Sequence, residues 1–249
     1  MRRHKPRKSL PQEIGKHLRA EAAIIPKAGK PADRAATRWK EARRSEWFEI
    51  VIATLKAMVG KGDPCMYCDS NEAAEVDHFK PISAFPENAF EWSNLLWVCG
   101  ICNRFKGGRF PPYTQPGAEI LNPLEVDPWR HFFMDELTGL LAGVWDEAMQ
   151  SNDARAESTI AIIELNRESL QERRRQRIKD MKRIAQDAVR QLDAGLIVAA
   201  DIQERISDMK NAAYQPDVAE YFLDGPGGEI EPFKSLLETV RRENEVNQG

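Results

Sequence analysis

The stretch VCGICNRFKGGR, residues 98–109, sets the fold of the central part of this chain. It holds Cys99 and Cys102, and a second Cys-x-x-Cys pair, Cys65 and Cys68, lies upstream with thirty residues between the pairs. Four thiolates at this spacing suit a tetrahedral zinc ion, because a two-residue gap lets both sulfurs of a pair point inward from a tight turn. The sequence therefore predicts a structural Zn²⁺; the alternative is four unrelated thiols in a core.

A zinc ion closed in by four sulfurs has no coordination position left for water, so it is expected to hold shape and perform no chemistry. It also leaves unexplained why Asn103 directly follows the second pair. Chemistry is therefore expected to come from residues between the cysteine pairs.

The composition limits the class of protein. The chain has 249 residues, of which 42% are hydrophobic and 30% charged, with a net charge of -3. No apolar run approaches the roughly 18 residues that a membrane span needs, and no apolar segment follows the basic N-terminal residues as in a secretory signal. We expect a soluble, cytoplasmic protein with no membrane partner, in which disulfides are disfavoured.

Residue patterns divide the chain into regions. We expect a mainly α protein with a small α+β core: a basic flexible arm at 1–15, helices at 16–62, the cysteine-rich core at 63–112, an irregular connection at 113–151 and helices at 152–249. A helix is expected to end near Gly60, and Asn166 is the expected N-cap of a helix over 167–192.

The segment EVDHFKP, residues 75–81, carries the candidate chemistry. Short apolar stretches at 75–79 and 95–99, bounded by turn residues, favour strands. Neighbouring side chains on a strand point to opposite faces, so Asp77 and His78 can serve one site only if the strand ends or twists there. Lys80-Pro81 supplies such an ending.

These motifs resemble those of the HNH nucleases of the ββα-metal fold, in the subclass with a four-cysteine zinc. The resemblance covers Asp77-His78, Asn94 and Asn103, framed by CMYC and CGICNRFKGG. It implies that His78 is the general base, that Asp77 and Asn103 hold the catalytic cation, and that Asn94 ties the loop that aims His78. Asn103 stands where strict HNH members have His, as in other recognised members. Hard oxygen ligands favour Mg²⁺ or Mn²⁺ as that cation.

Several basic residues are candidates for phosphate contacts. Lys106 lies one helical turn after Asn103. It is expected to face the substrate phosphate at the catalytic cation, or else to be a solvated surface lysine. The weaker candidates are Lys80, Arg104, Arg109, Arg173 and Arg177. The run at 173–183 fits a phosphate-binding stripe, but interspersed acids fit a solvated helix equally well. The N-terminal cluster Arg2, Arg3, Lys5, Arg7 and Lys8 is expected in the flexible arm, with nucleic-acid contact as the alternative. His131 is expected to serve packing.

A broader resemblance spans about residues 39–183 and relates the chain to the HNH nuclease subunits of Septu-type antiphage defence, which also accompany some retrons. It implies DNA as the substrate, with RNA not excluded, and an ATPase partner encoded nearby. Two other functions remain open: a zinc-stabilised nucleic-acid-binding module without turnover, and an HNH-type ribonuclease.

Overall fold

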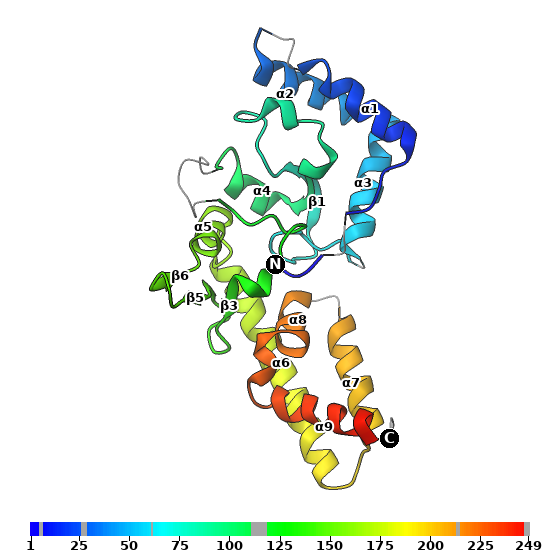
Figure 1. Cartoon of the computed structure of the whole chain (residues 1–249). Coiled ribbons are helices and arrows are strands. Elements are labelled where there is room, and N and C mark those ends of the chain that lie inside the picture. Colours follow the sequence, from blue (N-terminus) through cyan, green and yellow to red (C-terminus); the bar gives the residue numbers. More distant parts are fainter. Residues whose placement is uncertain (5–6, 26–28, 61, 111–118, 213–214, 247–249) are drawn as a thin grey trace. The chain divides into compact units, whose positions relative to one another are not determined.

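The computed structural model describes residues 1–4, 7–25, 29–60, 62–110, 119–212 and 215–246. The chain separates into two compact units (Figure 1). The first consists mainly of Arg3–Val126 and Ala154–Glu164, and the second of Asp127–Asp153 and Leu165–Gly249. Helices dominate both, and the strands form only two-stranded sheets, so the expected fold class is confirmed. Within the described ranges, every helix is too short or too polar to cross a bilayer.

Three helices open the first unit: α1 (Gln12–Ala22), α2 (Pro31–Ala42) and α3 (Glu46–Val59). Pro31 stands at the start of α2, where a missing amide hydrogen costs nothing. The α3 helix ends as expected beside Gly60, whose positive φ of 87° suits glycine. The buried faces of these helices bring aromatic side chains together. The Trp39 and Phe48 rings pack edge to face, with 5.0 Å between their centroids.

The cysteine-rich segment forms the expected hairpin and helix. Strand β1 (Ala73–His78) pairs antiparallel with β2 (Leu95–Cys99), with His78 opposite Leu95 and an irregularity near the start of β1. Helix α4 (Gly100–Lys106) follows β2 at once and ends at Gly107, which has a φ of 49°. Two short 3₁₀ turns, η2 (Pro86–Asn88) and η3 (Trp92–Asn94), lie in the loop between the strands. This ββα order matches the resemblance stated above.

The N-terminal segment is not the flexible arm that the sequence predicts. The Arg7 guanidinium donates to the carbonyls of Trp92 at 2.6 Å, Leu95 at 3.0 Å and Ser93 at 2.8 Å. It also lies over the Trp92 ring, 5.1 Å from its centroid, and the indole N–H donates to the Lys8 carbonyl at 2.8 Å. A fork of donors matched to three carbonyls orders this segment. Lys5 lies outside the described residues.

Residues 127–153 of the second unit contain hairpins where an irregular connection over 113–151 was expected, and residues 113–118 lie outside the described residues. After η4 (Pro128–Arg130), strands β3 (Phe132–Met134) and β4 (Leu141–Gly143) pair, and β5 (Trp145–Asp146) pairs with β6 (Ser151–Asn152). His131 Nδ1 lies 2.7 Å from the Asp153 carboxylate. That contact fits the structural role expected for His131.

Helices α5 (Ala154–Ile163), α6 (Glu168–Asp193), α7 (Ala199–Asn211), α8 (Pro216–Asp224) and α9 (Phe233–Val246), with the turn η5 (Pro226–Glu229), complete the chain. The expected N-cap role of Asn166 is wrong. Its carboxamide pairs with both backbone groups of Leu141, at 2.8 Å and 2.7 Å, and so holds β4. Arg167 occupies the cap position of α6 without a side-chain cap. A long-range pairing has displaced the local one.

Two arginines of the basic run on α6 turn inward, whereas Arg175, Lys179 and Arg183 are exposed and stay candidates for the phosphate stripe. Arg174 has no exposed surface and faces the equally buried Asp217 on α8 at 3.6 Å. Arg177 is buried and donates to the Met209 carbonyl at 2.6 Å. Arg177 therefore links α6 to α7, and the prediction that it contacts nucleic acid is wrong. Arg173 is half-buried beside these two inward-facing residues.

Replacing Arg174 with Ala is expected to lower the free energy of unfolding of the second unit by about 3 kcal/mol, because it leaves a buried carboxylate without its guanidinium partner. Urea unfolding with hydrogen exchange in α6 measures this. The matched control is Arg175→Ala, which removes a guanidinium paired with Glu172 at the surface and should change stability by less than about 0.5 kcal/mol. Equal losses in the two variants would contradict the assigned role of the buried pair.

Candidate functional site

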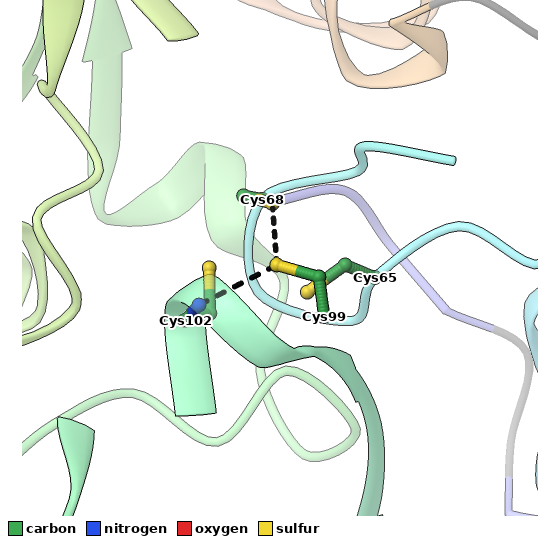
Figure 2. A group of neighbouring side chains, drawn as sticks. All are labelled: Cys65, Cys68, Cys99 and Cys102. Carbon is green, nitrogen blue, oxygen red and sulfur yellow. Dashed lines mark hydrogen bonds between the residues drawn. The ribbon is translucent and has the colours of Figure 1, made fainter. Parts of the chain in front are cut away.

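The four cysteine sulfurs form one buried cluster (Figure 2). All lie within 4.8 Å of one another, and the Cys68 and Cys99 sulfurs are 3.8 Å apart. In a tetrahedral zinc site with Zn–S bonds of about 2.3 Å, neighbouring sulfurs are about 3.8 Å apart. No disulfide joins any two of these four cysteines. Their chemistry and spacing therefore fit a closed, four-coordinate zinc ion.

Backbone hydrogen bonds hold the cluster to the hairpin. The Cys65 amide donates to the Ser70 carbonyl at 2.9 Å, and the Met66 amide donates to the Trp97 carbonyl of β2 at 2.9 Å. The Cys102 amide donates to the Cys99 sulfur at 3.4 Å at the start of α4, as drawn in Figure 2. One cysteine pair thus anchors the turn before β1, and the other anchors the junction between β2 and α4.

His78 lies at the end of β1 with its ring almost fully buried. Its Nε2 is 2.8 Å from the Ala89 carbonyl, which can only accept a hydrogen bond, so in the neutral ring Nε2 carries the proton and Nδ1 keeps its lone pair. The ring packs edge-on against Trp39 of α2, with 4.2 Å between the ring centroids. Burial lowers the pKa of His78 to about 4. The imidazole is therefore neutral at physiological pH and presents one nitrogen as a proton acceptor.

Asn94 ties together the two ends of the loop that follows His78. Its Oδ1 accepts from the Lys80 amide at 2.7 Å, and its Nδ2 donates to the carbonyls of Lys80 and Asn88, each at 3.0 Å. The Phe79 amide donates to the Asn94 carbonyl at 2.9 Å. This geometry holds the chain on either side of Ala89, the residue that orients the His78 ring.

Asp77 turns to the opposite side of β1, towards α4. Its Oδ2 accepts from the Tyr67 hydroxyl at 2.9 Å, and its Oδ1 accepts from the Lys106 ammonium at 3.2 Å. Burial is the largest influence on the Asp77 carboxyl and raises its pKa, which the neighbouring Lys106 opposes. The same burial lowers the pKa of Lys106. The pair joins the strand to the helix within the core.

Lys106 does not face outward as expected of a phosphate ligand. It has no exposed surface, and its ammonium also donates to the His78 carbonyl at 2.6 Å. The reason is that α4 packs against β1, so its last turn lies over the end of the strand and not in solvent. In this arrangement Lys106 secures the backbone at His78.

Asn103 pairs with a residue that sequence reasoning missed. Its Nδ2 donates to the Glu75 carboxylate at 2.6 Å, which leaves its Oδ1 directed elsewhere, as a cation ligand requires. Strand alternation carried the signal, because Glu75 and Asp77 are two residues apart and share a face. A Cβ added at Gly100 would lie 2.9 Å from the Glu75 carboxylate, so a larger residue there would displace that side chain.

Asp77, Glu75, Asn103 and Lys106 thus gather on the α4 side of β1, while the His78 ring contacts α2 and the loop. Among the residues that the structure describes, only the four cysteines form a cluster of three or more His, Cys, Asp or Glu side chains near enough to share a metal ion. The carboxamide of Asn103 is not one of these side-chain types. Convergence of His78, Asp77 and Asn103 on one cation therefore stays a prediction.

The weaker phosphate candidates differ in exposure. Arg104 on α4 is exposed, and Lys80 is half-buried with its ammonium 5.9 Å from the Phe85 ring centroid. The Arg109 guanidinium donates to the carbonyl of Phe105 and, at 3.0 Å, to that of Ile162 on α5. Arg109 therefore joins α4 to α5, and Arg104 stays an exposed candidate for a phosphate contact.

Comparisons with known proteins agree with this geometry. The family profile of the HNH endonucleases matches residues 65–109. Protein ninG of Salmonella phage P22 is 25% identical over 126 residues, 46% of this chain and 62% of the relative, and ninG of Escherichia phage lambda matches to the same extent. Septu protein PtuB of Bacillus thuringiensis is 26% identical over 122 residues, 47% of this chain and 41% of PtuB. The chain thus spans less than two thirds of the length of these relatives. Residues 65–109 of this chain form an HNH endonuclease domain, and the chain is homologous to phage ninG and to Septu PtuB.

Proposed function

We propose that this chain is a metal-dependent endonuclease that hydrolyses DNA phosphodiester bonds. The observation that carries the proposal is the state of His78: a buried, neutral imidazole with Nε2 held by the Ala89 carbonyl and Nδ1 left to accept a proton. The HNH profile over residues 65–109 supports it.

Hydrolysis needs a water nucleophile and compensation for charge on the phosphate and the leaving oxygen. His78 Nδ1 takes the proton from the attacking water. Asn94 and the Ala89 carbonyl keep the ring from turning, so the lone pair stays in one direction. A bound Mg²⁺ or Mn²⁺ would supply Lewis-acid stabilisation of that charge, and Asp77 and Asn103 offer the hard oxygens to hold it. Zn²⁺ on the four cysteines would serve only the fold.

A substrate panel tests the proposal. The purified chain is incubated with duplex DNA, single-stranded DNA and RNA, each with Mg²⁺, Mn²⁺ or EDTA. Cleavage of DNA with either cation and none with EDTA is the expected result. Cleavage of RNA alone would favour the ribonuclease alternative, and binding without cleavage would favour the nucleic-acid-binding module.

We further propose a role in bacterial antiphage defence, together with an ATPase partner encoded nearby, in the cytoplasm. The similarity to Septu protein PtuB supports this role. Co-expression with a neighbouring ATPase gene, followed by plaque assays with the pair and with each protein alone, tests it. Protection that requires both genes is expected, and equal protection by either gene alone would contradict the partnership.

Arg7 is expected to support cleavage by ordering the loop that carries Asn94. Replacing Arg7 with Ala removes three hydrogen bonds to loop carbonyls and should cost about 2 kcal/mol of stability in this region. Faster hydrogen exchange at residues 79–95, with slower DNA cleavage, is the expected result.

The control for Arg7 is Lys8→Ala, because Lys8 contacts the loop through its backbone carbonyl and a side-chain truncation keeps that bond. Arg7→Lys should be intermediate, since an ammonium cannot match three carbonyls with a planar fork. Unchanged exchange in Arg7→Ala would contradict the ordering role.

A further inference from the structure

Tyr67 connects the cysteine cluster to the candidate cation ligand. It lies between Cys65 and Cys68 in the CMYC turn, and its hydroxyl reaches across to the Asp77 carboxylate at 2.9 Å. Both side chains are buried, with exposed fractions of 0% for Tyr67 and 5% for Asp77. A hydrogen bond of this length between two buried groups is electrostatically stronger than one in water.

The position of Tyr67 is set from both ends of its turn. The turn begins at Cys65 and ends at Cys68, which both belong to the cysteine cluster. Between them, the Met66 amide donates to the Trp97 carbonyl on β2. The Trp97 amide in turn donates to the Met66 sulfur at 3.3 Å. A phenol carried by such a turn has little freedom to move, so it fixes the direction of the carboxylate that it contacts.

The two donors at Asp77 differ in what they do to its charge. Lys106 brings a positive charge, which competes with any cation for the carboxylate oxygens. The Tyr67 hydroxyl is neutral, so it can orient Asp77 without reducing the negative charge that attracts a cation. Burial, together with the adjacent Asp77, raises the pKa of Tyr67 well above its ordinary value, so the hydroxyl stays a donor.

We infer that Tyr67 is a positioning residue through which the zinc-binding turn orients Asp77 for a divalent cation. This inference rests on the proposed function, because it takes Asp77 as a ligand of the catalytic cation. Groups that hydrogen-bond to metal ligands commonly change metal affinity by about 10- to 100-fold when they are removed.

The test compares the zinc-loaded chain of 249 residues with its Tyr67→Phe variant, which loses only the hydroxyl. Mn²⁺ binding is measured by calorimetry without DNA, and zinc content by elemental analysis. We expect about tenfold weaker Mn²⁺ binding with zinc content unchanged. In cleavage assays the Mn²⁺ concentration for half-maximal rate should rise by the same factor, while the KM for DNA stays the same.

The matched control is Tyr221→Phe, which removes the hydroxyl of a buried tyrosine in the second unit and should leave Mn²⁺ binding unchanged. A double-mutant cycle with Asp77→Asn adds a second measurement: if Tyr67 acts through Asp77, Tyr67→Phe should have almost no further effect on the cleavage rate in that background.

Three results would overturn the inference. Unchanged Mn²⁺ affinity in Tyr67→Phe would exclude a positioning role while leaving the nuclease proposal intact. Loss of zinc or unfolding of that variant would show a purely structural role. If the wild-type chain itself binds no Mn²⁺ and cleaves nothing, the proposed function fails and the inference fails with it.

Discussion

DNA cleavage by the His78→Ala variant is expected to be about 10³-fold slower than cleavage by the wild-type chain. A positioned general base contributes about 10²- to 10⁴-fold to a rate. His78 is the only histidine among residues 65–109. The expected loss is in kcat, because the imidazole acts on water and not on binding of the DNA. Nicking of supercoiled plasmid with Mg²⁺ or Mn²⁺ provides the measurement.

Truncation of His78 also removes an edge contact with Trp39 and a hydrogen bond to Ala89, which should cost about 1–3 kcal/mol of stability. The assay therefore runs well below the melting temperature, with zinc content checked. His17→Ala is the matched control, because His17 stacks on Trp47 at 5.3 Å in the same unit but lies outside the candidate site. Cleavage by His78→Ala within threefold of wild type would refute the base assignment.

Replacing Cys65 with Ser is expected to unfold the hairpin and α4, with loss of the bound zinc. A structural zinc site contributes its binding free energy to folding, about 10–16 kcal/mol in small zinc domains. The cluster joins the turn before β1 to the start of α4, so its loss removes the link between the hairpin and the helix. Elemental analysis and thermal melting provide the measurements, and strong chelators should reproduce the effect in the wild-type chain.

Ser70→Ala is the graded control for the zinc prediction. It removes a hydroxyl that lies 3.2 Å from the Cys68 sulfur but leaves all four thiols in place, so zinc should remain bound with a small loss of stability. If Cys65→Ser keeps its wild-type melting temperature while holding no zinc, the four cysteines are merely core thiols.

Local chemistry explains which predictions agreed with the structure. Cysteine spacing, glycines at helix ends and short apolar stretches are properties of neighbouring residues, and they indicated the cysteine cluster, the two strands and the end of α3. His78 and Asn94 were found by motif, and the structure adds the carbonyl of Ala89 that selects the ring nitrogen available to accept a proton.

Predictions that depended on distant partners were less successful. Asn166 is a good N-cap by type, but the backbone of Leu141, 25 residues away, takes its carboxamide. Lys106 and Arg177 were expected to contact a phosphate or to be solvated, yet both donate to buried carbonyls, and Lys106 also contacts a carboxylate. The described part of the N-terminal arm is ordered because Arg7 meets three carbonyls more than 80 residues further along the chain.

The amino-acid order alone was sufficient to indicate the cysteine cluster, through the spacing within each pair, and the ββα core and the candidate base, through the resemblance to the HNH nucleases. Tertiary packing was needed to show that Asp77 faces Tyr67 and Lys106, that Glu75 holds Asn103, and that Arg174 and Arg177 of α6 turn inward. The physical reason is that a buried charge or amide must find a partner, and that partner can lie anywhere in the chain that the fold brings within about 3 Å.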